Sequence, residues 1–189
     1  MTSDVHPGLV DAAVHHFPGA AWQRCQAHLQ RDIVTASPRS LQREISHRYR
    51  EIVAAPTQEK SRILLNETLA AYETKAPSAM NILENGFDDA TATVMTSPTE
   101  LRVHIRTSNS IERLNIEVRR RDKVIGIFPS QESAFLLHGA LLMEIDERWS
   151  TERHLNMDLY RQWKNEQSKN GRQPLDFQPL PSHEHVATA

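Results

Sequence analysis

The sequence predicts a mostly α-helical protein, on the grounds of its composition and the spacing of its apolar residues. Only 6% of the residues are aromatic and only 6 are glycine, while the good helix formers Leu, Ala, Glu, Gln and Arg recur. Through most of the chain, apolar residues recur at spacings of three and four. At 189 residues, 39% of them hydrophobic and 24% charged, the chain is long enough for a medium-sized packed domain.

The amino-terminal part predicts a helix, a short strand and the start of a second helix. Pro7 stands at a favourable first-turn position, and Pro18 with Gly19 ends the first helix. The segment AAWQRC, residues 20–25, is the best strand candidate, because it is short, partly apolar and follows that turn. From Gln26 onward the apolar spacing becomes helical.

The middle of the chain predicts a helical subdomain over residues 36–100. We expect Gly86 to end the last of its helices, and the residues after it to form a loop or a weak extended segment. The expected helices are 41–55, 58–76 and 77–87, and the expected loop is 88–98.

The last third predicts two amphipathic helices. Asn109, with Glu112 three residues later, resembles a capping box that opens the first of them. The second helix covers residues 130–149, and its apolar stripe should pack on the core. The residues expected on the buried sides are Ile111, Leu114 and Val118 in the first helix and Phe135, Leu136, Leu142, Ile145 and Trp149 in the second.

The end of the chain changes character. A further helix is expected from residue 154. Residues 166–189 are rich in proline and polar residues, which is typical of a disordered tail.

Charge and cysteine content restrict the function classes. The net charge of −2 gives no overall attraction to nucleic acid, so any such binding must come from a local cluster. Cys25 has no second cysteine with which to form an intramolecular disulfide. The chain shows no leader and no apolar run near the roughly 20 residues of a spanning helix. We therefore expect a cytoplasmic protein without a membrane partner.

A basic cluster lies in one short region: Arg102, Arg106, Arg113, Arg119, Arg120, Arg121 and Lys123. On a helix, Glu112, Asn115 and Arg119 share one face. Such a face suits contact with DNA phosphates, and the residues we expect to make it are Asn115, Arg119, Arg120, Arg121 and Lys123. The alternative is a solvated amphipathic helix with internal ion pairs, since Glu117 and Asp122 temper the cluster.

Two carboxylates are candidates for chemistry on that DNA. Asp4 stands where a chain leaving a strand would turn into the first helix, and Glu112 opens a helix far along the sequence. Phosphoryl transfer on DNA commonly uses a few carboxylates that converge on Mg²⁺. The sequence pattern alone favours a structural role over a catalytic one, namely that Glu112 caps its helix and Asp4 is solvated.

Cys25 and His28 form a second constellation. A structural Zn²⁺ needs four ligands, and these residues supply two of them, without a second pair at finger-like spacing. We therefore predict no metal at this pair from the sequence. The interpretation is a buried cysteine beside a hydrogen-bonded histidine.

Three blocks of the sequence resemble Mutator-type bacterial insertion-sequence transposases. They are SDVHPGLVDAAVHHFPGAAWQRCQAHLQRDI, IRTSNSIERLNIEVRRRDKVIGIFPSQESA and LLMEIDERWSTERHLNMD. With the helical sequence between them, they account for about residues 2 to 160. The resemblance implies a ribonuclease-H-like catalytic domain with an Asp-Asp-Glu triad, and metal-dependent cleavage and transfer of DNA strands with Mg²⁺ as cofactor.

The resemblance implies a role for each candidate residue. Asp4 would be the second acid of the triad and Glu112 the third, both catalytic and both metal-binding, while Cys25 and His28 would be the family's signature pair. It also implies a domain division: a remnant of the ribonuclease-H-like core at 1–35, a helical insertion at 36–100, the Glu-bearing and final core helices at 101–165, and the tail at 166–189.

The departures from the family pattern shape the expected function. The family's first acid lies upstream of the block that begins here at Thr2, so we expect a carboxyl-terminal fragment that is inactive by itself. Asp32, Ile116 and Asp122 also depart from the usual residues, and an acid at position 122 weakens the local positive field. The expected partners are transposon-end DNA and a full-length transposase or a second copy of the chain. The alternatives are a non-catalytic DNA-binding or dimerising regulator and a plain helical protein.

Overall fold

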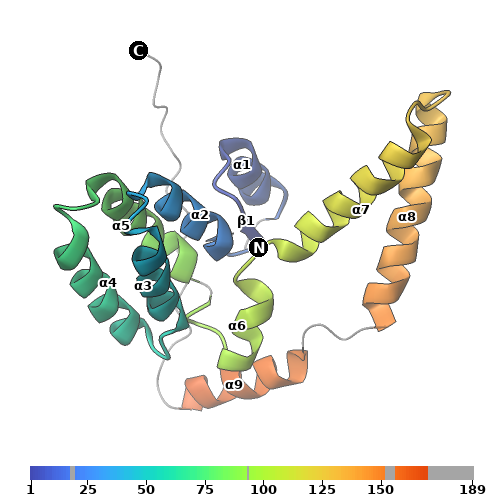
Figure 1. Ribbon diagram of the computed structural model, residues 1–189. Helices are drawn as coiled ribbons and strands as arrows, with labels where there is room; N and C mark the ends of the chain where they lie inside the picture. Colours follow the sequence, from blue (N-terminus) through green and yellow to red (C-terminus); the bar gives the residue numbers. More distant parts are fainter. Residues whose placement is uncertain (18–19, 93, 152–155, 170–189) are drawn as a thin grey trace.

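The computed structural model describes residues 1–17, 20–92, 94–151 and 156–169. Its elements, in chain order, are β1 (Thr2–Ser3), α1 (Pro7–His16), β2 (Gln23–Arg24), α2 (Gln26–Ala36), α3 (Gln42–Ala54), α4 (Gln58–Tyr72), α5 (Pro77–Thr91), α6 (Thr99–Ile105), α7 (Asn109–Ile125), α8 (Gln131–Thr151) and α9 (Met157–Lys169). The prediction of a mostly α-helical protein is confirmed. Helices α2 to α5 gather into one unit, which we call the body (Figure 1). Helices α7 and α8 form a two-helix arm that extends away from it (Figure 1).

The hydrophobic core lies in the body. Helix α2 packs on α5 and α3, and α4 packs on α3 and α5. The large core side chains are Leu29, Ile33, Ile45, Tyr49, Ile52, Leu65, Tyr72, Met80, Leu83 and Phe87. The core thus joins α2 to the helices of the segment predicted as an insertion, and the domain boundaries themselves stay predictions.

Helix α5 runs through Gly86 and continues to Thr91. The prediction that Gly86 ends this helix is therefore wrong, and so is a loop that starts at residue 88. A Cβ at Gly86 would lie 2.6 Å from Leu29 Cδ1 and 2.8 Å from Arg24 Nη1. The glycine allows α5 to approach α2 and the end of β2 closely, and a larger residue would prevent that approach.

Strands β1 and β2 form a parallel pair, with Thr2 opposite Gln23 and Ser3 opposite Arg24. The strand expected over 20–25 is confirmed at these two residues. Helix α1 connects the strands, as a parallel pair requires. Gln23 is fully buried. Its Nε2 donates a hydrogen bond to the Ile105 carbonyl at 3.2 Å, and its Oε1 accepts one from the Val94 amide at 2.8 Å. The buried amide thereby ties the sheet to the last residue of α6 and to the segment before that helix.

The arm leaves most of its apolar side chains exposed, contrary to the packing we predicted for both of its helices. No residue of α7 is buried, and Ile111, Phe135 and Leu136 are 52%, 65% and 75% exposed. Helix α7 ends at Gly126, whose φ of 75° suits glycine, and α8 then returns beside α7 (Figure 1). Periodicity identified the apolar face of each helix, but it does not tell whether another element covers that face.

The far end of the chain adds one helix. Helix α9 extends to Lys169, and residues 170–189, the rest of the predicted tail, lie outside the described residues. Among the described helices, none has an apolar stretch that could span a bilayer.

Candidate functional site

The root of the arm, residues 105–108, is hydrogen-bonded to the edge of the small sheet. The Ile105 carbonyl accepts from Gln23 Nε2, and the Arg106 carbonyl accepts from the Gln26 amide at 3.0 Å. The hydroxyl of Thr2 also donates to the Ile105 carbonyl. These bonds place the first turn of α7 against the start of α2. They therefore fix where Glu112 lies.

Glu112 does not form the capping box that its spacing suggested. The helix cap is Ser108 and not Asn109, and no side chain caps the helix. In a capping box, the glutamate side chain would accept a hydrogen bond from the backbone amide of the cap residue. The amide of Ser108 donates instead to Cys25 Sγ at 3.4 Å. The Ser108 hydroxyl lies 3.2 Å from Glu112 Oε1 and donates to it. The capping interpretation was wrong, and the Glu112 carboxylate is directed toward neighbours outside its own helix.

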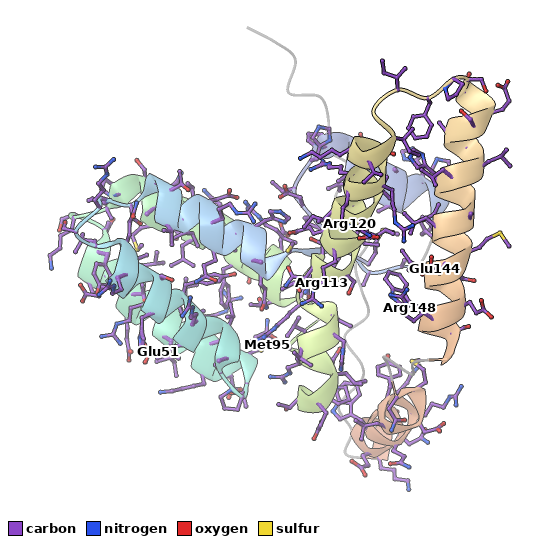
Figure 2. All side chains as sticks on the ribbon, turned by 45° about the vertical axis from the view of Figure 1, so that its right-hand side comes forward. Glu51, Met95, Arg113, Arg120, Glu144 and Arg148 are labelled. Carbon is purple, nitrogen blue, oxygen red and sulfur yellow. The ribbon has the colours of Figure 1, made fainter. Side chains whose placement is uncertain are left out.

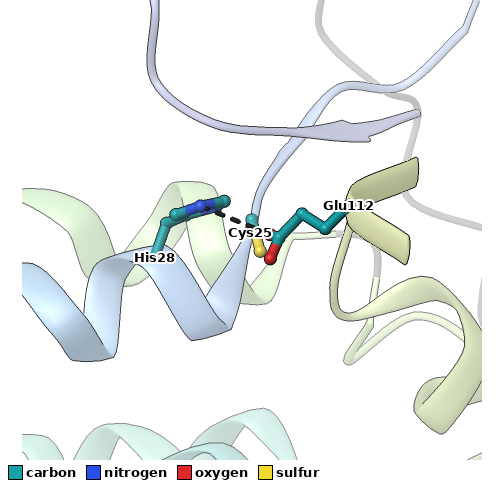
Figure 3. A group of neighbouring side chains, drawn as sticks. All are labelled: Cys25, His28 and Glu112. Carbon is teal, nitrogen blue, oxygen red and sulfur yellow. Dashed lines mark ion pairs between the residues drawn. The ribbon is translucent and has the colours of Figure 1, made fainter. Parts of the chain in front are cut away.

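Those neighbours are Cys25 and His28. Cys25 stands at the cap position of α2 and is fully buried, and His28 follows three residues later on the same side of the helix. The His28 Nε2 atom lies 3.3 Å from Glu112 Oε1. Figure 3 shows the three side chains directed toward one another from α2 and α7. Cys25 Sγ, a His28 ring nitrogen and a Glu112 carboxylate oxygen all lie within 4.8 Å of one another.

Asp4 lies at the same sheet edge but outside this cluster. It directly follows β1, and the carbonyl of Ser3 accepts a hydrogen bond from the Cys25 amide at 2.8 Å. Because parallel strands end at the same edge of a sheet, Asp4 and Cys25 leave that edge side by side. The Asp4 carboxylate accepts from the neighbouring Val5 amide at 2.8 Å. The structure thus joins the Glu112 carboxylate to Cys25 and His28, and among the described residues it does not bring the Asp4 carboxylate into that group.

The predicted phosphate-binding residues all lie on α7, where Figure 2 labels Arg113 and Arg120. Two of them form ion pairs with an acidic residue of the same helix. Arg120 donates to Glu117 at 2.7 and 2.9 Å, and Arg121 donates to Glu117 at 3.0 Å. These hydrogen bonds, from Arg120 first and then from Arg121, lower the pKa of Glu117 to about 2. Arg121 also lies 4.0 Å from Glu144 on α8.

The remaining members of that set are Asn115, Arg119 and Lys123, and all three are exposed. Neither Arg119 nor Lys123 forms an ion pair with another described residue. The acid at position 122 pairs instead with His138 of α8 at 2.7 Å. The free positive charge on α7 therefore comes from fewer residues than the sequence suggested. Arg102, also in the basic cluster, donates to the carbonyls of Ser97, Ala55 and Pro56 and holds α6 to the body.

Ser108 is the residue at this cluster that sequence reasoning missed. Its amide and hydroxyl contact Cys25 Sγ, and its hydroxyl also contacts Glu112. A serine directly before an apolar helical pattern is a cap signal, so Ser108 could have been selected in place of Asn109.

Comparisons with a family model and with individual known proteins all identify transposases as similar to this chain. The family model described as "Transposase, Mutator family" matches residues 1–152. The chain is 36% identical over 162 residues to the transposase for insertion sequence element IS256 in transposon Tn4001 of Staphylococcus aureus, a match that covers 84% of this chain and 41% of that protein.

Two further relatives match to a similar extent. The chain is 34% identical over 152 residues to the transposase for insertion sequence element IS406 of Burkholderia multivorans, with 80% of this chain and 39% of that protein covered. It is 34% identical over 160 residues to the transposase for insertion sequence element IS1081 of Mycobacterium tuberculosis, with 84% and 38% covered. The chain thus spans about two fifths of the length of these relatives.

Proposed function

The chain belongs to the Mutator family of transposases, and from this we propose that it contributes part of a catalytic centre for strand cleavage and transfer at the ends of an insertion sequence. One observation carries the proposal. The root of the arm is hydrogen-bonded to Gln23 and Gln26, and the Glu112 carboxylate lies at Cys25 and His28. The backbone of Cys25 is in turn hydrogen-bonded to Ser3, the residue before Asp4.

The donor chemistry of these acids fits the proposed cofactor. Mg²⁺ prefers oxygen ligands, and Asp4 and Glu112 both offer carboxylate oxygens, so they are the residues that would hold the ion. When bound, Mg²⁺ supplies activation of the attacking oxygen and stabilisation of the leaving oxygen. The chain itself orients the carboxylate of Glu112 through the Ser108 hydroxyl. On the same helix, Arg119 and Lys123 are free to contact phosphates.

We also propose that the β1–α1–β2 unit belongs to a ribonuclease-H-like sheet. The support is the parallel pairing of the two strands and the helix that connects them. A pair of two-residue strands needs further strands to be stable, so this assignment predicts that strands outside the described residues extend the sheet. The resemblance implies three acids, of which these residues contain two. We therefore propose that the chain alone does not cleave DNA.

The catalytic proposal is tested by metal binding and by cleavage. Mn²⁺ is a paramagnetic substitute for Mg²⁺, and its titration should broaden the amide signals around Asp4 and Glu112 before others, with excess Mg²⁺ reversing the effect. Broadening confined to the acidic groups of the body would contradict the proposal. Labelled terminal-repeat DNA with Mg²⁺ should remain intact, and cleavage that Glu112→Gln abolishes would refute the inactivity of the chain alone.

The DNA contact is tested by salt dependence. Replacing Arg119 and Lys123 with glutamine should weaken DNA binding and reduce the slope of log affinity against log salt by about 2, because each lost phosphate contact lowers it by about 1. The matched control replaces Arg48 and Lys75 of the body, which removes the same charge from another surface. Equal loss in both double variants would show that only net charge matters.

A second candidate is a non-catalytic regulator that binds DNA or a full-length transposase. The exposed apolar residues of the arm, such as Leu136 and Met143 at 75% and 74% exposure, favour it. Under this alternative, Asp4→Asn and Glu112→Gln leave DNA binding unchanged and no Mn²⁺ effect is centred on them.

A further inference from the structure

A groove lies between α2 and α5 of the body, apart from the residues proposed for catalysis. Its volume is about 570 Å³, within the roughly 300–1,000 Å³ of small-ligand sites. Such sites are mostly apolar, whereas most of the side chains that line this groove are polar, so the lining suits a charged group. The polar residues of the lining are Arg24, Arg31, Asp32, Thr35, Asn81 and Asn85.

The lining of the groove carries a net positive charge. Arg24 Nη2 donates to Asp32 Oδ2 at 2.8 Å, so these two charges offset each other. Arg31 is exposed and forms no ion pair with another described residue. One positive charge therefore remains, and it matches the single negative charge that each phosphate of a DNA backbone carries.

Arg24 has a donor that the described residues do not use. Its side chain is 12% exposed, and its Nε is buried without a hydrogen-bond partner among the described residues. The guanidinium lies close to α5, where a Cβ at Gly86 would be 2.8 Å from Nη1. A buried donor without a partner is rare and requires an explanation. An anion in the groove would give this guanidinium an acceptor, since Arg24 lines the groove.

The α5 wall of the groove adds neutral donors. Asn81 and Asn85 lie one helical turn apart on α5, and both are exposed. Asn85 Nδ2 donates to Asn81 Oδ1 at 3.0 Å, which leaves Asn81 Nδ2 as a donor without a partner among the described residues. On the α2 wall, Thr35 lies one turn after Arg31. Arginine, asparagine and threonine side chains all commonly contact DNA phosphates.

We propose that the groove between α2 and α5 binds a phosphate group of the DNA backbone, held by Arg31, Arg24 and Asn81. The proposal rests on the DNA contact proposed for α7 and adds a second contact on the body. The body and the arm lie on either side of the small sheet (Figure 1), so the two contacts would hold DNA at separated points. Inorganic phosphate and small phosphate esters offer the same chemistry.

Removing one charge from the groove tests the proposal. Arg31→Gln should weaken binding of a terminal-repeat duplex roughly tenfold near 0.1 M salt and reduce the slope of log affinity against log salt by about 1. Arg50→Gln is the matched control, because Arg50 is an exposed arginine of α3 that also forms no ion pair with another described residue. Circular dichroism checks the fold of both variants. Equal weakening in both would overturn the proposal, because only net charge would then matter.

Asp32 provides a change in the opposite direction. Asp32→Asn removes a negative charge from the groove and releases the Arg24 guanidinium, so it should strengthen DNA binding severalfold. Asp158→Asn is the matched control, because it breaks another Arg–Asp pair, on α9, and should give no such gain. An ion pair with a purely structural role predicts no gain for either variant. Unchanged or weaker DNA binding by a folded Asp32→Asn variant would therefore overturn the proposal.

Nuclear magnetic resonance separates the sources of phosphate. Duplex DNA should shift the side-chain amide signals of Asn81 and Asn85 at lower concentrations than inorganic phosphate or a nucleoside monophosphate does. A stronger response to either small compound would overturn DNA as the source.

The same signals separate this proposal from the contact on α7. A chain with Arg119 and Lys123 both replaced by glutamine should still show the DNA-induced shifts of Asn81 and Asn85. DNA binding that leaves these two signals unshifted in the unmodified chain would overturn the groove site, while the contact on α7 would stand. Shifts of Asn81 and Asn85 in a chain whose DNA affinity does not depend on Arg119 and Lys123 would support the groove and contradict the contact on α7.

Discussion

The body and the arm are built from similar amphipathic helices, but the body buries its apolar faces far more completely than the arm does. In α5, Ala79, Leu83 and Phe87 are at most 2% exposed, whereas in α8 Phe135 and Leu136 are 65% and 75% exposed. The arm is held instead by its root and by polar pairs such as Asp122–His138. Hydrophobic burial therefore stabilises the body, while a few hydrogen bonds at residues 105–108 determine where Glu112 lies.

Truncating one leucine in each region should give the largest difference in stability between the body and the arm. Leu83→Ala in α5 should lower the free energy of unfolding by about 2–5 kcal/mol, because it removes a fully buried side chain and leaves a cavity. Leu136→Ala in α8 should change it by at most about 0.5 kcal/mol. Urea denaturation followed by circular dichroism measures both values, and similar losses would mean that the arm also packs on a core.

A glycine pair sharpens the same contrast. Gly86→Ala should destabilise the body by about 1–3 kcal/mol, because its Cβ would meet Leu29 in a packed core. Gly139→Ala on α8 has nothing within 4 Å of the new Cβ, and it should stabilise the helix by up to about 1 kcal/mol. The thermal unfolding midpoints should move in opposite directions. A rise for Gly86→Ala would refute close packing of α5 on α2.

The smallest expected effect is the response of the arm to acid. Arg120 and then Arg121 lower the pKa of Glu117 from 4.5 to about 2. A lowered carboxyl pKa contributes stability that is present above pH 4.5 and is lost as the pH falls through about 2. Because Glu117 is partly exposed to solvent, the effect on stability is small. Carboxyl NMR should give a midpoint near 2 that Arg120→Gln raises toward 4.5, and a native midpoint near 4.5 would exclude these ion pairs.

Much of the fold follows from the sequence where apolar spacing is regular. The positions of α1 to α4 agree with the periodicity, because each is an amphipathic helix bounded by proline, serine or threonine. Gly86 misled the prediction, because a glycine that permits close packing and a glycine that ends a helix look alike in sequence. Helix α6, at seven residues, is too short to give a clear periodic signal.

The site was predictable in its parts but not in its assembly. Cys25, His28 and Glu112 were each selected from the sequence, yet their convergence depends on hydrogen bonds that the carbonyls of Ile105 and Arg106 accept from the Gln23 side chain and the Gln26 amide. Such contacts join segments far apart in the chain and leave no local pattern. The sequence also did not show which basic residues of α7 are paired. Arg120 and Arg121 are hydrogen-bonded to Glu117, whereas Arg119 and Lys123 are not, and this depends on the side-chain positions around Glu117.

The contact between His28 and Glu112 is the most direct test of this account, because it exists only if the root of the arm docks as described. Nuclear Overhauser spectroscopy on a chain with labelled histidine rings and glutamate side chains measures it. The structure predicts a cross-peak between the His28 ring and the Glu112 side chain, since Nε2 and Oε1 are 3.3 Å apart. Absence of this cross-peak, in a sample whose α2 and α7 signals are those of folded helices, would contradict the placement of Glu112 and the site built on it.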